Sequence, residues 1–260
     1  MLFKDIIGNN AVKKQLTEAV KNNRISHAQL FFGKSGSAKL ALALAYSQYL
    51  NCENKTENDS CGFCSSCLKF SNLSHPDLHL IFPVLKVNGV KTPTSDSFVN
   101  QWRELILSNQ YISINDWIDS FGTENKTGQQ GSIYIDEAAS IQRKLSLKNY
   151  EAEYRVVLIW MPERMNLTVA NKLLKLLEEP PKGTIFILVS EDESSTADDS
   201  EAADDNSDTE DNSDGSDESK TKSNKMSTTT ILIIIVGVLL VGTVVGVYCK
   251  NANVRNNMFI

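Results

Sequence analysis

Short apolar runs, separated by longer segments of mixed polarity, are the main pattern of the first 190 residues. Three runs of six or seven residues, rich in Leu, Ile, Val and Phe, lie at Ala28–Gly33, Arg155–Trp160 and Thr184–Ser190. Apolar runs of this length between more polar flanks predict buried strands. A run at Asp77–Phe82 predicts a fourth strand, which Pro83 ends because proline cannot donate to a sheet.

Helical periodicity occupies two of the intervening segments. The Ala- and Leu-rich residues 40–50 follow the first strand, and Val169, Leu173 and Leu177 recur at the spacing of one helix face. Two prolines at 180–181 end the second of these helices. Strands that alternate with helices predict an α/β fold, in which a parallel sheet carries helices on both faces.

The composition supports a globular domain, but not over the whole chain. Hydrophobic residues make up 41% of the 260, enough for a core, and the net charge is −6. These values exclude a basic nucleic-acid arm, a collagen-like chain and a disulfide-dense secreted module. The acidity lies in residues 191–218, which hold 14 acidic residues and no basic residue. Residues 1–190 are therefore near neutral and form the predicted globular domain.

Residues 191–230 contain no Leu, Ile, Val, Phe, Tyr or Trp. Such a segment cannot bury enough apolar surface to offset the entropy of ordering it, so it is predicted to be an acidic, disordered linker. A solvated spacer is the simplest interpretation. Because Ser213, Ser216 and Ser219 lie among acidic residues, a phosphorylated acidic tail is the alternative.

Residues 231–249 are apolar and carry no charge. As a helix these 19 residues would be about 28 Å long, which matches the ~30 Å hydrocarbon core of a bilayer. They predict a transmembrane helix, with residues 250–260 as a short tail. Because Met1–Asn10 lacks the apolar region of a signal peptide, the protein would be tail-anchored with its globular domain in the cytoplasm. A buried pair of strands is the alternative, although only isolated glycines could provide its turn.

The first predicted strand leads through residues 34–38 into the first helix, which is the layout of a phosphate-binding loop. In the pattern G-x-x-x-x-G-K-[ST], Gly33 takes the first position and Lys39 the lysine position, while Gly36 lies inside the loop. These three residues are the candidate nucleotide-binding residues. Ala38 replaces the second glycine and Leu40 replaces the Ser or Thr.

These replacements argue against ATP hydrolysis by this chain. Ala38 adds a Cβ where the backbone wraps around phosphates, and Leu40 has no hydroxyl to bind Mg²⁺. The strand that ends at Trp160 lacks the acid that positions Mg²⁺ and water in P-loop ATPases, and Glu163 lies three residues too far along. No catalytic residue is predicted. Weak nucleotide binding through Lys39, a loop that only packs, and an unorthodox ATPase that uses Lys39 and Glu163 stay open.

Four of the five cysteines fall within sixteen residues, as Cys52, Cys61, Cys64 and Cys67. Without a signal peptide, disulfides are not expected. Two-residue spacings aim pairs of thiolates at one ion, so the four predict a closed, structural Zn²⁺ site without an open position for water. Free thiols and an iron–sulfur cluster are the alternatives. The histidines at 75 and 79 are predicted to flank a strand rather than bind the metal.

Five segments stand out in order along the chain: FKDIIG (3–8), SHA leading into LFFG (26–33), the cysteine module (52–67), HPDLH (75–79) and, most specifically, ANKLLKLLEEPP (170–181). Together they resemble the AAA+ clamp-loader ATPase family of bacterial DNA polymerase III over residues 1–190. Within that family the degenerate loop is similar to that of the delta-prime subunit, and the longer middle of the chain (residues 101–117 and 143–166) looks like the delta-prime of the Bacteroidetes lineage.

The resemblance implies a non-catalytic scaffold in the loading of the sliding clamp during DNA replication. Its partners would be the gamma/tau and delta subunits, and it would meet the clamp and primer-template DNA through the assembly. After the strand that ends at Ser190, the family continues with an arginine-containing segment, a last strand, a lid and a collar domain, which this sequence is expected to lack. The second hypothesis is a tail-anchored membrane protein with a degenerate P-loop binding domain, held to the membrane by residues 231–249.

Overall fold

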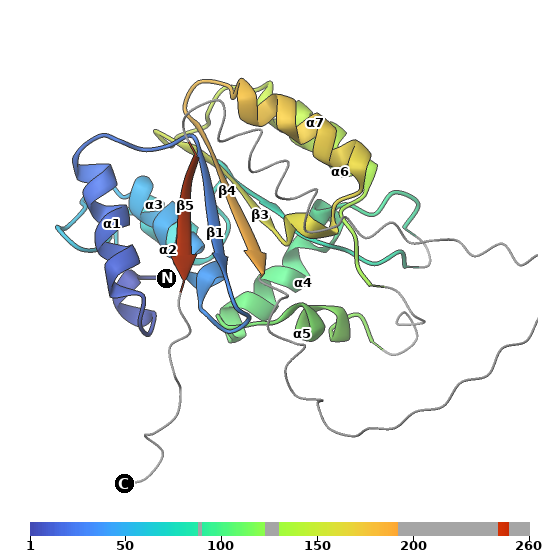
Figure 1. Cartoon of the computed structure of the whole chain (residues 1–260), viewed down its shortest axis with the longest axis horizontal. Helices are drawn as coiled ribbons and strands as arrows, with labels where there is room; N and C mark the ends of the chain where they lie inside the picture. The colour runs from blue at the N-terminus through green and yellow to red at the C-terminus, as the bar shows by residue number, and fades with distance from the viewer. Residues whose placement is uncertain (88–89, 123–129, 192–243, 250–260) are drawn as a thin grey trace, which may run out of the picture.

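The computed structural model describes residues 1–87, 90–122, 130–191 and 244–249 (Figure 1). The described part contains helices, strands and two short 3₁₀ turns. The helices are α1 (Asn10–Lys21), α2 (Lys39–Leu50), α3 (Ser65–Ser71), α4 (Ser95–Ser108), α5 (Ile114–Asp119), α6 (Ile135–Leu145) and α7 (Leu167–Glu178). The strands are β1 (Ala28–Gly33), β2 (Leu78–Ile81), β3 (Arg155–Trp160), β4 (Thr184–Glu191) and β5 (Val244–Cys249), and the turns are η1 (Phe3–Asp5) and η3 (Pro162–Arg164).

All five described strands form one parallel sheet, in the order β2-β3-β4-β1-β5. The four strands predicted from apolar runs are confirmed. The last of them, β4, extends one residue beyond the predicted boundary of the globular domain and ends at Glu191. This residue was expected to begin the acidic linker, and its place in the sheet corrects that boundary.

Alternate residues of the central strands pack into two different cores. On β3, Val156, Leu158 and Trp160 belong to the core that α2, α4 and α5 cover, whereas Val157 and Ile159 belong to the core of α6 and α7. Figure 1 shows α6 and α7 together on one side of the sheet, with α1, α2 and α3 on the other. Because side chains on a strand point alternately to opposite faces, a strand buried on both faces is apolar along its whole length. The predicted sheet with helices on both faces is confirmed.

Helix α2 is buried at every one of its positions, from Lys39 to Leu50. It packs on the sheet beneath α1 and α3, so no side of it faces solvent, and its apolar residues are not restricted to one stripe. At its end, the Tyr49 ring lies 5.7 Å from that of Phe3 in η1. Burial of the whole helix fixes the loop that precedes it, because Lys39 is its first residue.

Helices α4 and α5 are held by an aromatic cluster next to the carboxyl ends of β2 and β3. The Phe82 ring stacks on Trp102 with centroids 4.8 Å apart, and Trp117 meets it edge-on at 5.4 Å. The indole nitrogen of Trp117 donates a hydrogen bond to the Pro83 carbonyl oxygen at 2.6 Å. Offset and edge-on aromatic pairs add stability beyond the area that they bury. These helices therefore cover the sheet beside the P-loop.

The described part of the predicted transmembrane helix is a strand. Residues 244–249 form β5, which pairs in parallel with β1 from Ala28↔Val244 to Gly33↔Cys249. The prediction of a helix is therefore wrong for these six residues. Hydropathy does not distinguish an apolar helix from an apolar strand, whereas closely spaced valines favour an extended backbone when a strand edge is available. The sheet also has a fifth strand, where the sequence predicted that the core lacks its last one.

Among the described residues, no helix combines the length and the hydrophobicity needed to cross a membrane. The predicted linker after Glu191, the first thirteen residues of the predicted membrane helix (231–243) and the predicted tail (250–260) lie outside the described residues.

Candidate functional site

The four predicted metal ligands lie together in a small module between α2 and α3. The sulfur atoms of Cys52, Cys61, Cys64 and Cys67 all lie within 4.8 Å of one another. All but Cys61 are buried, and the Sγ atoms of Cys61 and Cys67 are 3.8 Å apart. A tetrahedral ion with Zn–S bonds of ~2.3 Å requires sulfurs roughly 3.8 Å apart. The observed spacing fits such an ion.

Backbone groups orient these sulfurs. The N–H of Cys61 donates to the sulfur of Cys52 at 3.2 Å, that of Cys64 to Cys61 at 3.3 Å, and that of Cys67 to Cys64 at 3.4 Å. Gly62 has φ +81°, a left-handed conformation that favours glycine and that turns the chain between the first two ligands of the C-x₂-C pair. The cysteine spacing thus produces a preformed, inward-facing donor set.

The thiols of this cluster differ in acidity. Burial acts to raise the pKa of Cys61, but N–H groups of Phe63 and Cys64 outweigh it and bring the pKa to about 6. Burial, together with the neighbouring Cys64 and Cys52 thiols, raises the pKa of Cys67. The lowered pKa of Cys61 favours its thiolate form, whereas a cation would have to displace the proton of Cys67 to bind its sulfur. Four thiolates around Zn²⁺ leave no open position, so the site would support structure rather than catalysis.

The two histidines stay outside the cysteine cluster, as the sequence predicted. His75 is buried and stacks on Phe70 with ring centroids 4.3 Å apart, and its Nε2 lies 3.3 Å from a carboxylate oxygen of Glu151. His79 lies on β2, where burial and the nearby Lys144 and Arg155 charges lower its pKa to about 4. Of the two, only His75 lies beside the module, since it lines a pocket together with Cys52, Ser65 and Ser66.

The P-loop connects the end of β1 at Gly33 to the first residue of α2, Lys39. Gly36 has φ +75°, which suits glycine. Ala38 has φ +60°, a left-handed conformation that costs a residue with a Cβ roughly 1–2 kcal/mol. The missing second glycine of the motif has therefore been replaced without losing the left-handed turn. Leu40 is buried and offers no hydroxyl.

Lys39 is bonded to the protein itself. Its side chain is 4% exposed, and its Nζ donates to the Lys34 carbonyl oxygen at 3.1 Å and to Oε1 of Glu191 at 2.9 Å. Sequence reasoning missed Glu191, because it placed this residue in the acidic linker. Gly36 and Lys39 line one small cavity, whereas Gly33 is the last residue of β1 and is not among its lining residues. The lysine faces a carboxylate at the end of β4.

Glu163, the acid considered for an unorthodox ATPase, turns toward β4. Its Oε2 accepts a hydrogen bond from the Ser190 hydroxyl at 3.0 Å, and its Oε1 accepts one from the Glu191 N–H at 3.3 Å. Burial, and to a smaller extent the Glu191 charge, raise the pKa of Glu163 to about 7. At the end of β3, Trp160 is buried against Trp102, with ring centroids 6.2 Å apart.

The space at the P-loop is small. The cavity beside Lys39 measures about 20 Å³, enough for about one water molecule. Besides the loop, it is lined by Gln110, Tyr111, Ile112, Trp160 and Glu191. A nucleotide phosphate therefore cannot enter this arrangement unless the lining side chains move.

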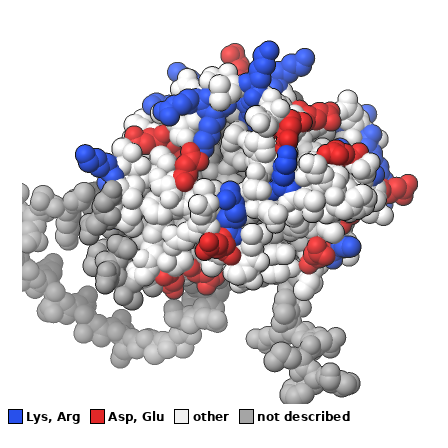
Figure 2. Space-filling view, turned by 180° about the vertical axis from the view of Figure 1, so that it is seen from behind, with Lys and Arg blue, Asp and Glu red and all other residues white. Residues whose placement is uncertain are grey.

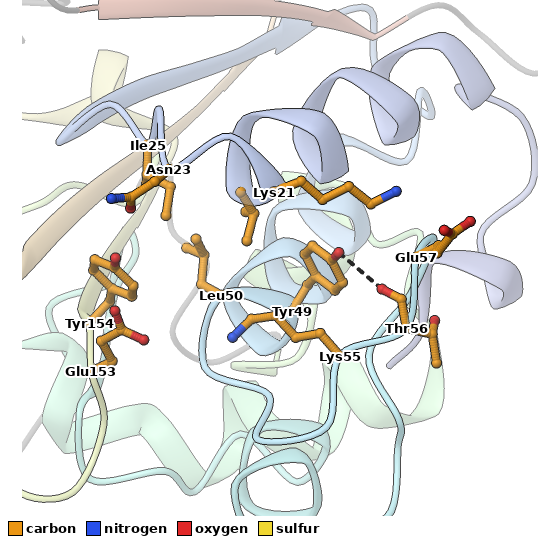
Figure 3. Close-up of a pocket in the computed structure, with 11 residues that line it drawn as sticks. Lys21, Asn23, Ile25, Tyr49, Leu50, Lys55, Thr56, Glu57, Glu153 and Tyr154 are labelled. Atoms are coloured by element: carbon orange, nitrogen blue, oxygen red, sulfur yellow. Dashed lines mark hydrogen bonds between the residues drawn. The ribbon is translucent and has the colours of Figure 1, made fainter.

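A larger pocket of about 410 Å³ lies away from the P-loop, at the end of the domain where α1 and α2 finish and β3 begins (Figure 3). Tyr49 and Tyr154 stand on opposite sides of it, and Lys55 extends from below Tyr49 toward the side of Glu153. The Tyr49 hydroxyl donates to the Thr56 carbonyl oxygen at 3.2 Å. Lys55 and Glu153 bring opposite charges to this pocket. Neither the cysteines nor the P-loop residues line it.

The surface visible in Figure 2 mixes charges of both signs, with basic side chains gathered along its upper edge and acidic ones between and below them. A continuous basic surface, which is what binding to the phosphate backbone alone would use, does not extend over this face.

The comparison with protein families gives one match of broad extent. A family model described as DNA polymerase III, delta subunit, matches residues 8–197. The matched region contains the cysteine module, the P-loop and the first four strands.

Curated relatives match over the same region. The chain is 28% identical to DNA polymerase III subunit delta' of Bacillus subtilis over 181 residues, 69% of this chain and 41% of that protein. It is 27% identical to delta' of Pseudomonas aeruginosa over 65% of this chain and 38% of that protein. It is 25% identical to subunit tau of Bacillus subtilis over 73% of this chain and 26% of tau. The chain thus spans less than half the length of these relatives.

Among solved structures, a DNA polymerase III gamma subunit-related protein from Thermotoga maritima aligns with 69% of this chain and 39% of that one. The TM-score is 0.37 and the sequence identity is 15%.

Proposed function

This chain belongs to the DNA polymerase III delta subunit family, and we propose that it acts as a delta-prime-like, non-catalytic subunit of a clamp loader. The family resemblance carried by the sequence is thereby confirmed. One observation carries the non-catalytic part of the proposal: the P-loop lysine is bonded to Glu191 of the same chain and lies next to a cavity of about 20 Å³. The parallel order β2-β3-β4-β1-β5 fits an AAA+-type core.

The chemistry of the site supports a subunit that does not hydrolyse ATP. Phosphoryl transfer needs Mg²⁺ held by a hydroxyl and an acid, together with a group that positions water. Leu40 and Trp160 stand at the two metal-holding positions, and Glu163 is bonded to β4 instead. The P-loop fold then serves as a rigid support for neighbouring subunits, and ATP would be hydrolysed elsewhere in the assembly.

The cysteine module would hold Zn²⁺ through Cys52, Cys61, Cys64 and Cys67, and the ion would cross-link a segment with little core of its own. The module joins distant parts of the domain. Asp59 accepts hydrogen bonds from the N–H groups of Phe3 and Lys4, both at 3.0 Å. Its metal would therefore stabilise the amino-terminal edge of the domain.

The partners that this function implies are the gamma/tau and delta subunits. The names of the relatives, which include delta', tau and gamma, support a role in such a complex. The sliding clamp and primer-template DNA would be reached through the assembly, because the near-neutral domain does not present a basic surface on the face in Figure 2. This assembly would act in the cytoplasm.

Reconstitution tests this function. The full chain, mixed with purified delta and gamma/tau subunits from the same organism, is expected to co-elute with both in size-exclusion chromatography, with a mass by light scattering that includes this chain. Omission of gamma/tau provides the control for the order of assembly. Elution of a folded chain apart from both subunits would overturn the proposal.

A further inference from the structure

The start of α2 has the donors of an anion site. Lys39 Nζ is held there, and the first N–H groups of a helix lack intrahelical partners and carry the positive end of its dipole. The hydroxyl of Ser37, which lines the same cavity, is buried and has no hydrogen-bond partner among the described residues. These groups belong to a loop and a twelve-residue helix whose burial keeps them in place.

An anion from the same chain already lies in this site. The Glu191 carboxylate is 2.9 Å from Lys39 Nζ, with only 15% of the Glu191 side chain exposed and 4% of the lysine side chain. The two residues are 152 positions apart, so the pair joins the end of β4 to the beginning of α2. Glu163 holds the backbone at Glu191, because its Oε1 accepts the Glu191 N–H at 3.3 Å.

We propose that Glu191 is an internal anion that closes the P-loop, and that without its carboxylate this loop is a binding site for polyphosphate. The carboxylate supplies the negative charge that Lys39 and the helix terminus would otherwise take from phosphate oxygens. It also occupies the space, since about 20 Å³ remains beside it. The Lys39–Glu191 ion pair thus keeps phosphate out of the loop, in addition to the effect of Ala38 and Leu40 in place of the glycine and the hydroxyl residue of the motif.

Two substitutions separate the charge of Glu191 from its volume. Glu191→Gln removes the charge and keeps the size, whereas Glu191→Ala removes both. Glu178→Gln, on the exposed side of α7, is the matched control for loss of one negative charge. Each full-length variant is titrated with inorganic pyrophosphate by isothermal calorimetry without Mg²⁺, and with ADP in parallel to distinguish a nucleotide from free polyphosphate.

Glu191→Ala is expected to bind pyrophosphate at least tenfold more tightly than the natural chain, and Glu191→Gln to show a smaller gain. Adding Lys39→Met should abolish the gain. The unfolding temperature of each variant verifies that it is folded, and Glu191→Gln decides the matter if the alanine variant does not fold. The proposal is overturned if no folded Glu191 variant gains affinity, if the gain persists without Lys39, or if Glu178→Gln gains as much. The outcome is independent of assembly with clamp-loader subunits.

Discussion

The carboxylate of Asp77 accepts the backbone N–H of Tyr150 at 2.7 Å, across 73 positions of sequence. Its second oxygen accepts the N–H groups of Glu151 and Ala152 at 2.8 and 2.9 Å. The side chain is 2% exposed, so a single buried carboxylate ties the segment before β3 to the start of β2. Because β3 is an interior strand that pairs with both β2 and β4, this contact fixes the position at which the chain enters the sheet.

Replacing Asp77 with Asn is expected to lower the free energy of unfolding by about 2–4 kcal/mol. The amide nitrogen cannot accept the hydrogen bonds that one carboxylate oxygen accepts, and buried N–H groups would lose charged partners. Urea denaturation measures the loss. Asp116→Asn, at an exposed helix cap with its own N–H bond from Ser113, is the control and should cost about 1 kcal/mol. An equal, small loss in both variants would contradict this role for Asp77.

The same contact predicts a dependence on acid. Burial acts to raise the pKa of Asp77, but the three N–H groups outweigh it and hold the pKa below 3.8. A depressed carboxyl pKa stabilises the fold fully above the unfolded value and loses that contribution as the pH falls through the folded one. The natural chain should therefore lose stability more steeply than Asp77→Asn below about pH 4. Parallel slopes in urea denaturation between pH 6 and pH 3 would exclude this contribution.

For Glu163 we expect the opposite pH dependence of stability, near neutral pH. Its pKa is raised from 4.5 to about 7, chiefly by burial. The folded state therefore binds the proton more tightly, and this contribution to stability is full below pH 4.5 and is lost as the pH rises through 7. The loss is on the order of 3 kcal/mol. Glu163→Gln should remove this part of the dependence between pH 5 and pH 8, and an unchanged slope would contradict a buried, titrating carboxyl.

The cysteine module predicts about one zinc per chain by elemental analysis, with no visible absorption of an iron–sulfur cluster. Removing the metal with a chelator, or replacing Cys64 with Ser, should lower the unfolding temperature. A loss of about 3 kcal/mol corresponds to roughly 6–12 °C for a domain of this size. Ser66→Ala, a buried neighbour that is not a ligand, is the control. Metal-free protein with an unchanged unfolding temperature would show that the four thiols do not hold a structural ion.

The strand β5 predicts a cost for proline at position 247. In β5, proline cannot donate a backbone hydrogen bond and resists strand geometry, so Val247→Pro in the full chain should destabilise the domain by about 1–3 kcal/mol. Amide hydrogen exchange along β1, from Ala28 to Gly33, should also become faster. Unchanged exchange in β1 would mean that residues 244–249 do not pair with it. Val247→Ala, which keeps the backbone N–H at this position, is the matched control.

The sequence predicts well the elements whose burial is local. The apolar runs at β1, β3 and β4 are buried on both faces of the sheet, so their hydrophobicity alone locates them. The cysteine spacing likewise predicts a cluster, because three of the four ligands lie within seven residues and turn on Gly62. Helices α4 and α5 were not predicted, since they are fixed by Trp102 and Trp117 against Phe82, contacts that periodicity does not reveal.

Long-range pairs account for the other differences. The partner of Lys39 lies 152 residues away, at the last position of β4, where the acidic composition that follows concealed it. The segment 244–249 is as apolar as a membrane helix, and only the open edge of β1 distinguishes a strand from that alternative. In both cases the neighbour that decides the structure is distant in sequence.

Clamp loading by a reconstituted complex tests the central proposal most directly. Gamma/tau, delta and this chain are combined with sliding clamp and primed DNA, and the ATP-dependent formation of clamp–DNA complexes is measured with and without the chain. We expect loading to require the chain, while the chain alone releases no phosphate from ATP. Loading at an equal rate without it, or ATP hydrolysis by the isolated chain that Lys39→Met abolishes, would contradict a non-catalytic clamp-loader subunit.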